Sequence, residues 1–322
     1  MAFNRTQIAI QDILTRHKST GEPVDRLIRE IARGRGLGSR ERREVADEVF
    51  SGLRQKPWPE WFNKRLQKEY GTNYPALEHS LRQRAKPVLA VDIRQSTAQA
   101  IGQKLQALAV PFTPSKLSSR ALILETDSVD LKDLPGCWWM DDGSQYIAEQ
   151  IKGTPEDRIL DLCAGAGGKT RILLATGAKV TMADNNDKRL AHIDGVQRVV
   201  ADGRTFKSNS QFDWILIDAP CSGTGTLRHA PDLFGRLKEE DLKQYVKLQN
   251  ELVANAKTLL SETGKLIYAT CSLLEEENHR SFEELELVSS RQLLPSVEGC
   301  DGFYIAVFTK QPERYNQSAP SK

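Results

Sequence analysis

The feature that most constrains this chain is a series of short apolar segments that alternate with helix-like segments from about residue 155 onward. Six of the apolar segments are candidate strands, at 158–163, 179–184, 196–202, 212–218, 264–271 and 302–309. The clearest helical spacing between them lies at 238–261, and we expect Gly264 to stop that helix. Short buried strands interleaved with helices predict an α/β fold class, in which a mostly parallel sheet is covered on both faces.

The residues before this region fall into two parts of different character. The first part reads as helices, because apolar side chains recur at helical spacing, for example at Val45, Val49 and Leu53. The second part mixes short helical and strand-like pieces, which is typical of a small α+β subdomain. We therefore predict a helical module at 1–72, a linking subdomain at 73–150, an α/β domain at 151–312 and a flexible tail at 313–322.

The charges are distributed unevenly along the chain. The 322 residues carry a net charge of +2, but residues 1–86 hold 18 Lys and Arg against 11 Asp and Glu. The remaining residues hold 27 Lys and Arg against 32 Asp and Glu, so the body of the protein is slightly acidic. A basic N-terminal module suggests attachment to a polyanion such as RNA. A solvated helical surface explains the same charges equally well.

Composition argues against several classes of protein. No apolar run approaches the length of a membrane span, and the N-terminus lacks the layout of a secretory signal, so we expect a cytoplasmic protein without membrane contact. The five cysteines include no C-x-x-C pair and the five histidines are scattered, so no metal site is predicted. Cysteines of a cytoplasmic protein stay as thiols, free for packing or for chemistry.

The first candidate strand runs into a turn of small residues with the sequence Asp-Leu-Cys-Ala-Gly-Ala-Gly-Gly-Lys-Thr, at 161–170. Small residues let the backbone approach a ligand closely at the carboxyl end of a strand. Asp184 ends the next candidate strand, 19 residues after Gly165, where a carboxylate can accept both ribose hydroxyls of an adenosine. Asp202 ends the third candidate strand, beside the expected position of an adenine.

Three kinds of cofactor site compete for this turn. A dinucleotide-binding site has the pattern G-x-G-x-x-G, which the glycines of this turn do not match. A P-loop would want G-x-x-x-x-G-K-[ST]; the segment Gly168-Lys169-Thr170 fits, but Cys163 replaces the first glycine. S-adenosylmethionine carries no phosphates and needs only close backbone and acidic groups, which the residues supply. The turn alone does not decide whether the ligand is S-adenosylmethionine or one of the other two.

Two cysteines stand at the ends of neighbouring candidate strands. Cys221 follows the fourth strand within Asp218-Ala-Pro-Cys221, and Cys271 follows the fifth within Thr-Cys271-Ser. The carboxyl ends of parallel strands meet at one edge of a sheet, so we expect both thiols and Asp218 to face the crevice beside the glycine-rich turn. A free cysteine is often simply buried in a core, and that explanation suits Cys137 and Cys300 better.

This arrangement fits methylation of cytosine at C5. Cytosine C5 is a poor nucleophile, but a thiolate that adds to C6 converts the ring into an enamine-like species that can attack a methyl sulfonium. A helix beginning after Ser272, at 273–285, would favour the thiolate of Cys271 through its N-terminus. Asp218 can bond N3 and the exocyclic amine of the base, and Cys221 can assist release after methyl transfer.

At these residues the chain resembles the Sun/Fmu-type RNA cytosine-5 methyltransferases, the NOL/NOP/Sun family. The resemblance covers most of the chain and is most specific between residues 155 and 310. Residues 27–54 also look like the helical RNA-binding module that precedes bacterial members. The matching motifs are the turn at 161–170, the loop Asp218-Ala-Pro-Cys-Ser-Gly-Thr-Gly, the strand end Thr270-Cys-Ser with Glu277-Asn278, and Asp301-Gly-Phe-Tyr-Ile-Ala.

The resemblance implies a Rossmann-like S-adenosylmethionine methyltransferase domain that acts on RNA, with small-subunit ribosomal RNA as the default target. It makes Cys271 the nucleophile, Cys221 the releasing cysteine and Asp218 a catalytic partner. We expect a monomer. The residues implied to line the S-adenosylmethionine pocket are Cys163, Ala164, Gly165, Ala166, Gly167, Gly168, Lys169, Asp184, Asp202 and Asp218.

The chain also departs from the family pattern. Ala166 replaces the usual proline of the turn, and the span from Asp184 to Asp202 is short, so we expect the helix at 188–194 to be reduced. Two other functions stay open. One is a non-catalytic RNA-binding relative, which the presence of both cysteines and Asp218 argues against. The other is a P-loop nucleotide hydrolase, which Cys163 argues against.

Overall fold

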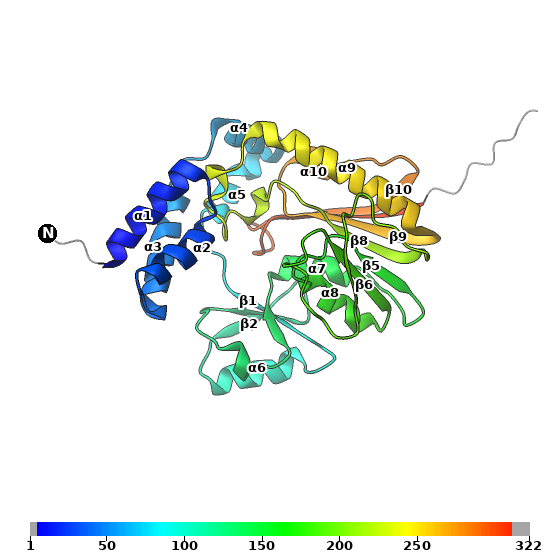
Figure 1. Cartoon of the computed structure of the whole chain (residues 1–322), viewed down its shortest axis with the longest axis horizontal. Helices are drawn as coiled ribbons and strands as arrows, with labels where there is room; N and C mark the ends of the chain where they lie inside the picture. Colours follow the sequence, from blue (N-terminus) through cyan, green and yellow to red (C-terminus); the bar gives the residue numbers. More distant parts are fainter. Residues whose placement is uncertain (1–4, 311–322) are drawn as a thin grey trace, which may run out of the picture.

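The computed structural model describes residues 5–310, and the predicted tail at 313–322 lies outside them. Three parts are visible in Figure 1: helices of the N-terminal part on the left, a small sheet below, and a large sheet with its helices on the right. The fold is a Rossmann-like α/β domain preceded by a helical region and a small α+β subdomain, as predicted. No helix among the described residues has the length and apolar character needed to span a bilayer.

The large sheet has seven strands in the order β10-β11-β9-β8-β5-β6-β7. The five strands from β9 to β7 in that order run parallel, whereas β11 pairs antiparallel with both β9 and β10. All six predicted strands are present. The strands are β5 (Arg158–Asp161), β6 (Lys179–Asp184), β7 (Gln197–Val200), β8 (Phe212–Asp218), β9 (Leu260–Thr270), β10 (Leu285–Leu293) and β11 (Phe303–Lys310).

Helices cover both faces of this sheet, because its central strands are buried on both sides. One face packs against α7 (Asp142–Glu149) and α8 (Gly168–Leu173) in a core that includes Met182 and Ile267. The other face packs against α9 (Leu242–Leu259) in a core that includes Ile215 and Tyr268. Short 3-10 turns connect these elements at Leu174–Thr176 (η4), Thr224–Thr226 (η5), Leu233–Gly235 (η6) and Glu239–Asp241 (η7).

The N-terminal helices form two separate cores. The helices α1 (Arg5–Thr20), α2 (Val24–Leu27), the π-helical turn η1 (Ile28–Ala32) and α3 (Ser39–Arg54) enclose the first core. The helices α4 (Glu60–Tyr70) and α5 (Tyr74–Leu81), joined by η2 (Gly71–Asn73), pack instead against residues of the large domain, among them Leu227, Leu233 and Leu274. The predicted boundary at residue 72 therefore falls between two helices that share one core.

The small subdomain is a four-stranded antiparallel sheet in the order β2-β3-β1-β4. Its helix α6 packs on that sheet through Ile101 and Leu105. Its elements are β1 (Val88–Val91), α6 (Ala98–Ala107), β2 (Phe112–Pro114), β3 (Ala121–Leu124), η3 (Leu131–Asp133) and β4 (Cys137–Trp139).

Two predicted helix boundaries are wrong. The helix α9 ends at Leu259 and β9 begins at the next residue, so Gly264 lies inside a strand and stops no helix. The helix predicted at 273–285 exists only as α10 (Glu275–Asn278), after which the chain turns toward the edge strand β10. This helix has a single turn because the side chains of Glu277 and Asn278 are buried and bonded to neighbouring segments.

The segment between β6 and β7 is short for a crossover that contains a helix. Residues 185–196 are all described, and they form turns without a helix. These 12 residues are near the minimum for a connection between parallel strands. The helix expected at 188–194 is therefore reduced to turns.

Candidate active site

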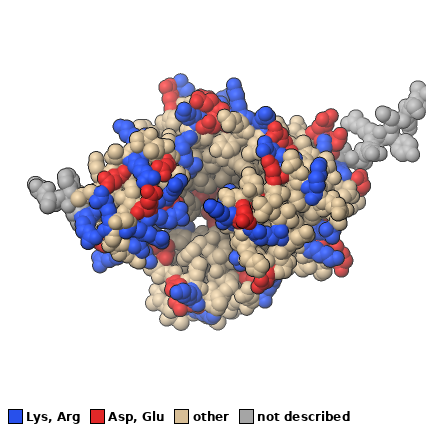
Figure 2. Space-filling model, in the orientation of Figure 1, with Lys and Arg blue, Asp and Glu red and all other residues tan. Residues whose placement is uncertain are grey.

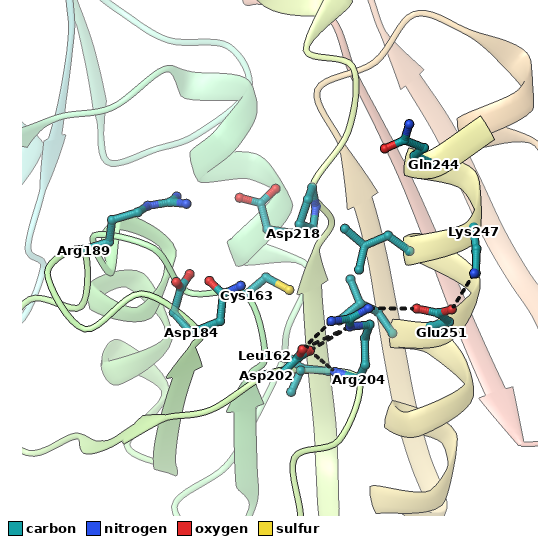
Figure 3. A pocket seen from close by; sticks show the side chains of 15 residues that line it. Leu162, Cys163, Asp184, Arg189, Asp202, Arg204, Asp218, Gln244, Lys247 and Glu251 are labelled. Carbon is teal, nitrogen blue, oxygen red and sulfur yellow. Dashed lines mark hydrogen bonds and ion pairs between the residues drawn. The ribbon is translucent and has the colours of Figure 1, made fainter. Parts of the chain in front are cut away.

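The carboxyl ends of β5, β6 and β8 surround a pocket of about 560 Å³ (Figure 3). The strand β5 lies between β6 and β8, so the strand order reverses there, and this is the place where open α/β sheets bind ligands. The volume suits a small cofactor. Four of the predicted cofactor residues line the pocket: Cys163, Asp184, Asp202 and Asp218.

The glycine-rich turn is shaped by its glycines and by Asp184. Gly165 and Gly167 adopt positive φ angles of 54° and 75°, a region that residues with a Cβ rarely adopt. The backbone N–H of Gly165 donates to Oδ2 of Asp184 at 2.9 Å, and the N–H of Asn186 donates to Oδ1 at 2.9 Å. Asp184 thus holds the turn in place, and each of its oxygens keeps a lone pair for a ribose hydroxyl.

The far side of the pocket carries a chain of charges. Arg204 donates from Nη2 to Asp202 at 2.6 Å and from Nη1 to Glu251 at 3.3 Å, and Lys247 lies 3.9 Å from Glu251. Figure 3 shows this chain opposite Asp184 and Arg189. Asp202 is therefore already paired with a cation, and its contact with an adenine stays a prediction.

Several lining residues escaped the sequence analysis. Gln244, Lys247 and Glu251 lie on one face of α9, and their spacing of three and four residues was a readable signal for a shared face. Arg189 lies over Gly165, where an added Cβ would come within 2.8 Å of its Nη2. No sequence pattern pointed to Arg189, because it lies in the shortened connection after β6.

The two cysteines meet as predicted. Cys221 follows β8 and Cys271 follows β9, and their Sγ atoms are 3.3 Å apart. Both are partly buried. The hydrogen bond to Cys271, together with burial, raises the pKa of Cys221 well above its ordinary value. Cys221 therefore remains a thiol at neutral pH and can donate its hydrogen to the sulfur of Cys271.

A partly buried ion pair lies at the glycine-rich turn. The ammonium of Lys169 donates to Oδ2 of Asp218 at 2.6 Å, and the side chain of Asp218 is 35% exposed. Burial alone would lower the pKa of Lys169, but attraction to Asp218 outweighs it and the net pKa is raised. A thiolate at Cys271 would add to this attraction. The helix N-terminus expected near Cys271 is limited to the single turn α10, which begins at Glu275.

The loops that carry the cysteines are joined through one buried carboxylate. Oε2 of Glu277 accepts from the hydroxyls of Ser222 and Ser272, each at 2.5 Å. Its Oε1 accepts from the backbone N–H of Ser222 at 2.9 Å and from Gln249 at 3.0 Å. Each serine directly follows one of the two cysteines, so Glu277 fixes the spacing between the thiols.

Comparison with known proteins agrees with this geometry. Residues 148–287 match the family described as 16S rRNA methyltransferase RsmB/F, and residues 58–131 match the RsmF/B-like ferredoxin-like domain. The chain is 31% identical over 304 residues to ribosomal RNA small subunit methyltransferase B of Enterobacter sp. (strain 638), covering 84% of this chain and 71% of that protein. Across relatives of this name, the chain spans 65–71% of their length.

Solved structures share the fold. The structure titled PH0851 has a TM-score of 0.81 at 17% identity, covering 96% of this chain and 100% of its own. A methyltransferase homolog protein from Pyrococcus horikoshii has a TM-score of 0.69 at 21% identity, covering 79% of this chain and 96% of its own. These structures share the fold, and the sequence matches place the chain in one family. The chain belongs to the RsmB/F family of ribosomal RNA methyltransferases, as the resemblance predicted.

Proposed function

We propose that the protein transfers a methyl group from S-adenosylmethionine to C5 of a cytosine in small-subunit ribosomal RNA. The observation that supports this most is the pair of sulfur atoms 3.3 Å apart at the ends of β8 and β9. One thiol suffices for packing, whereas two thiols in contact near the partly buried pair of Lys169 and Asp218 provide both an attacking and a releasing group. The names of the relatives support ribosomal RNA of the small subunit as the target.

The residues divide the reaction between them. The sulfur of Cys271 adds to C6, which places electron density on C5, while Asp218 holds N3 and the exocyclic amine of the base. The bound cofactor supplies the electrophilic methyl group. After transfer, the C5 proton leaves to water and the C6–S bond breaks, which returns Cys271 as a thiolate. The thiol of Cys221 donates a hydrogen bond to that departing sulfur, consistent with its raised pKa.

The cofactor site can be tested separately from the chemistry. Asp184→Ala should weaken the binding of S-adenosylhomocysteine by roughly 2–4 kcal/mol, because the ribose hydroxyls lose a charged acceptor and the turn loses its bond to Gly165. Isothermal titration calorimetry measures this loss. Asp187→Ala, an exposed carboxylate in the following turn, is the control. Unchanged affinity in Asp184→Ala would assign the ribose contact to another carboxylate.

The target can be identified in cells. Bisulfite sequencing of ribosomal RNA, with and without the gene, should show one cytosine that loses protection when the gene is absent. Complementation with wild-type protein should restore protection, and complementation with Cys271→Ala should not. An unchanged pattern in the small-subunit RNA would contradict the proposed target.

A further inference from the structure

A second hollow, of about 760 Å³, lies where the three parts of the protein meet. Its walls come from α3, from residues 84–88 and the segment after β4, and from residues 228–229 that follow η5. Figure 2 shows a hollow near the centre of the molecule with Lys and Arg side chains on its rim. The lining contains five cations against three carboxylates: Arg43, Arg54, Arg84, Lys86 and Arg228 against Asp47, Asp127 and Asp141.

Arg54 and Arg228 lack a direct ion pair. Among residues 5–310, neither is bonded to a carboxylate, although Asp47 attracts Arg54 and Asp301 attracts Arg228 from a distance. Nη1 of Arg228 donates to the backbone oxygens of Gly299 and Cys300, but the Nε atom of each arginine is buried without a hydrogen-bond partner. They lie together, because Nη2 of Arg54 donates to the backbone oxygen of Arg228 at 3.2 Å. Burial and the nearby charge of Arg84 lower the pKa of Arg54. Cations crowded in this way would be stabilised by an anion.

The hollow adjoins the catalytic centre. Met140 lines it, and the Sδ atom of Met140 would lie 3.6 Å from a Cβ placed on Gly168 in the glycine-rich turn. His229 also lines it and lies 3.4 Å from the carboxylate of Asp301. The following residue, Gly302, donates its N–H to Gly225, and Gly225 donates its own N–H to the carbonyl oxygen of Cys271. The hollow is therefore connected to the backbone of Cys271, at the end of β9. The connection runs through the contact between His229 and Asp301 and then through these two hydrogen bonds.

An aromatic side chain completes the lining. Trp139, at the end of β4, is 39% exposed and lines the hollow together with the arginines and with apolar residues such as Phe50 and Met140. An exposed indole beside arginines is the combination that single-stranded nucleic acids use for stacking and phosphate contacts.

We propose that this hollow binds the single-stranded RNA segment next to the target cytosine, with a backbone phosphate between Arg54 and Arg228 and a base stacked on Trp139. The inference rests on the proposed function for the identity of the polyanion. It differs from a general role of the basic N-terminal helices, because the exposed arginines Arg35 and Arg40 are already paired with Asp12 and Glu44. Among the N-terminal helices, only one side of α3, from Arg43 to Arg54, lines the hollow.

The test is equilibrium binding of a single-stranded ribosomal RNA oligonucleotide at several salt concentrations, with saturating S-adenosylhomocysteine. Arg54→Gln should weaken binding about tenfold and flatten the salt dependence by roughly 0.7 in slope, the value for one phosphate contact on a single strand. Trp139→Ala should weaken binding about tenfold without changing that slope. The matched control is Arg40→Gln, on the same helix but with a side chain 93% exposed, which should bind like wild type.

Other outcomes of these experiments would contradict different parts of the proposal. If Arg54→Gln lowers the melting temperature, Arg43→Gln decides instead, because among residues 5–310 the side chain of Arg43 has one hydrogen bond, to Ser128 at 3.4 Å, and no ion pair. Equal losses in Arg40→Gln and Arg54→Gln would overturn the hollow as the RNA path. A second experiment titrates the protein with inorganic phosphate. If Arg54→Gln weakens phosphate binding but leaves RNA binding unchanged, the hollow is a site for free phosphate and not for RNA. Normal RNA affinities with no methylation of the oligonucleotide would contradict the proposed function but leave the hollow intact.

Discussion

Cys221→Ala should accumulate a covalent protein–RNA adduct, whereas Cys271→Ala should form none and lose roughly a thousandfold or more of its activity. The reason is the contact between the sulfurs at 3.3 Å. Without Cys221 the sulfur of Cys271 can still attack C6 and the methyl group can still transfer. Release is then slow, because the departing thiolate has lost its hydrogen-bond donor. The measurement is a denaturing gel after incubation with S-adenosylmethionine and unmodified ribosomal RNA.

The double variant is the main control for this experiment, and it should show no shifted band. Cys137→Ala removes a half-buried thiol from the small sheet and should behave like wild type. A shifted band with Cys271→Ala would mean that Cys221 attacks the base and that Cys271 assists the release. The target base must leave its stack to reach sulfur atoms between strand ends, so an unpaired cytosine should trap faster than a paired one.

Glu277→Ala should destabilise the protein by roughly 3–5 kcal/mol and also abolish trapping in the Cys221→Ala background. Glu277 is fully buried and accepts hydrogen bonds from Ser222, Ser272 and Gln249. Its removal takes the side-chain acceptor from the buried backbone N–H of Ser222 and one acceptor each from the two serine hydroxyls and from Gln249, and it removes these bonds between the two cysteine loops. Denaturant unfolding measures the first effect, and adduct yield measures the second.

The neighbouring Glu275 provides the matched control, because it lies on the same helical turn and is exposed. Glu275→Ala should change the free energy of unfolding by no more than about 0.5 kcal/mol. Glu277→Gln keeps the side-chain length and one acceptor oxygen, so it should lose less stability than Glu277→Ala. Full trapping in a folded Glu277→Ala protein would show that the cysteine spacing does not depend on this carboxylate.

The sequence predicted strands most clearly where both faces of a strand are buried. The central strands appear as continuous apolar runs such as Trp214–Ile217, because both faces of the sheet are covered. The edge strand β10 was missed, since six of its nine residues are exposed and its sequence, Leu-Glu-Leu-Val-Ser-Ser-Arg-Gln-Leu, lacks a buried face. Its glutamate-rich approach favours a helix locally, and only the pairing with β11 overrides that preference.

The site was predictable to the extent that it lies at strand ends. Asp184, Asp218, Cys221 and Cys271 follow from one rule, that carboxyl ends of parallel strands share an edge. The nearness of Lys169 to Cys271 was not predicted, because the two residues lie about a hundred positions apart in the chain. Contacts of that kind depend on tertiary packing and leave no local pattern.

The core shared by α4, α5 and residues 227–274 has a consequence for biosynthesis. Phe62, Leu66, Leu77 and Leu81 leave the ribosome long before the residues that cover them are made. Until about 150 further residues have emerged, these two helices can bury their apolar faces only against each other or against a chaperone. Closure of this core joins two helices that are made early to a segment that is made late and that includes Leu273 and Leu274, just after Cys271 in the chain. A nascent chain interrupted before residue 227 would therefore leave the apolar faces of α4 and α5 without the residues that cover them.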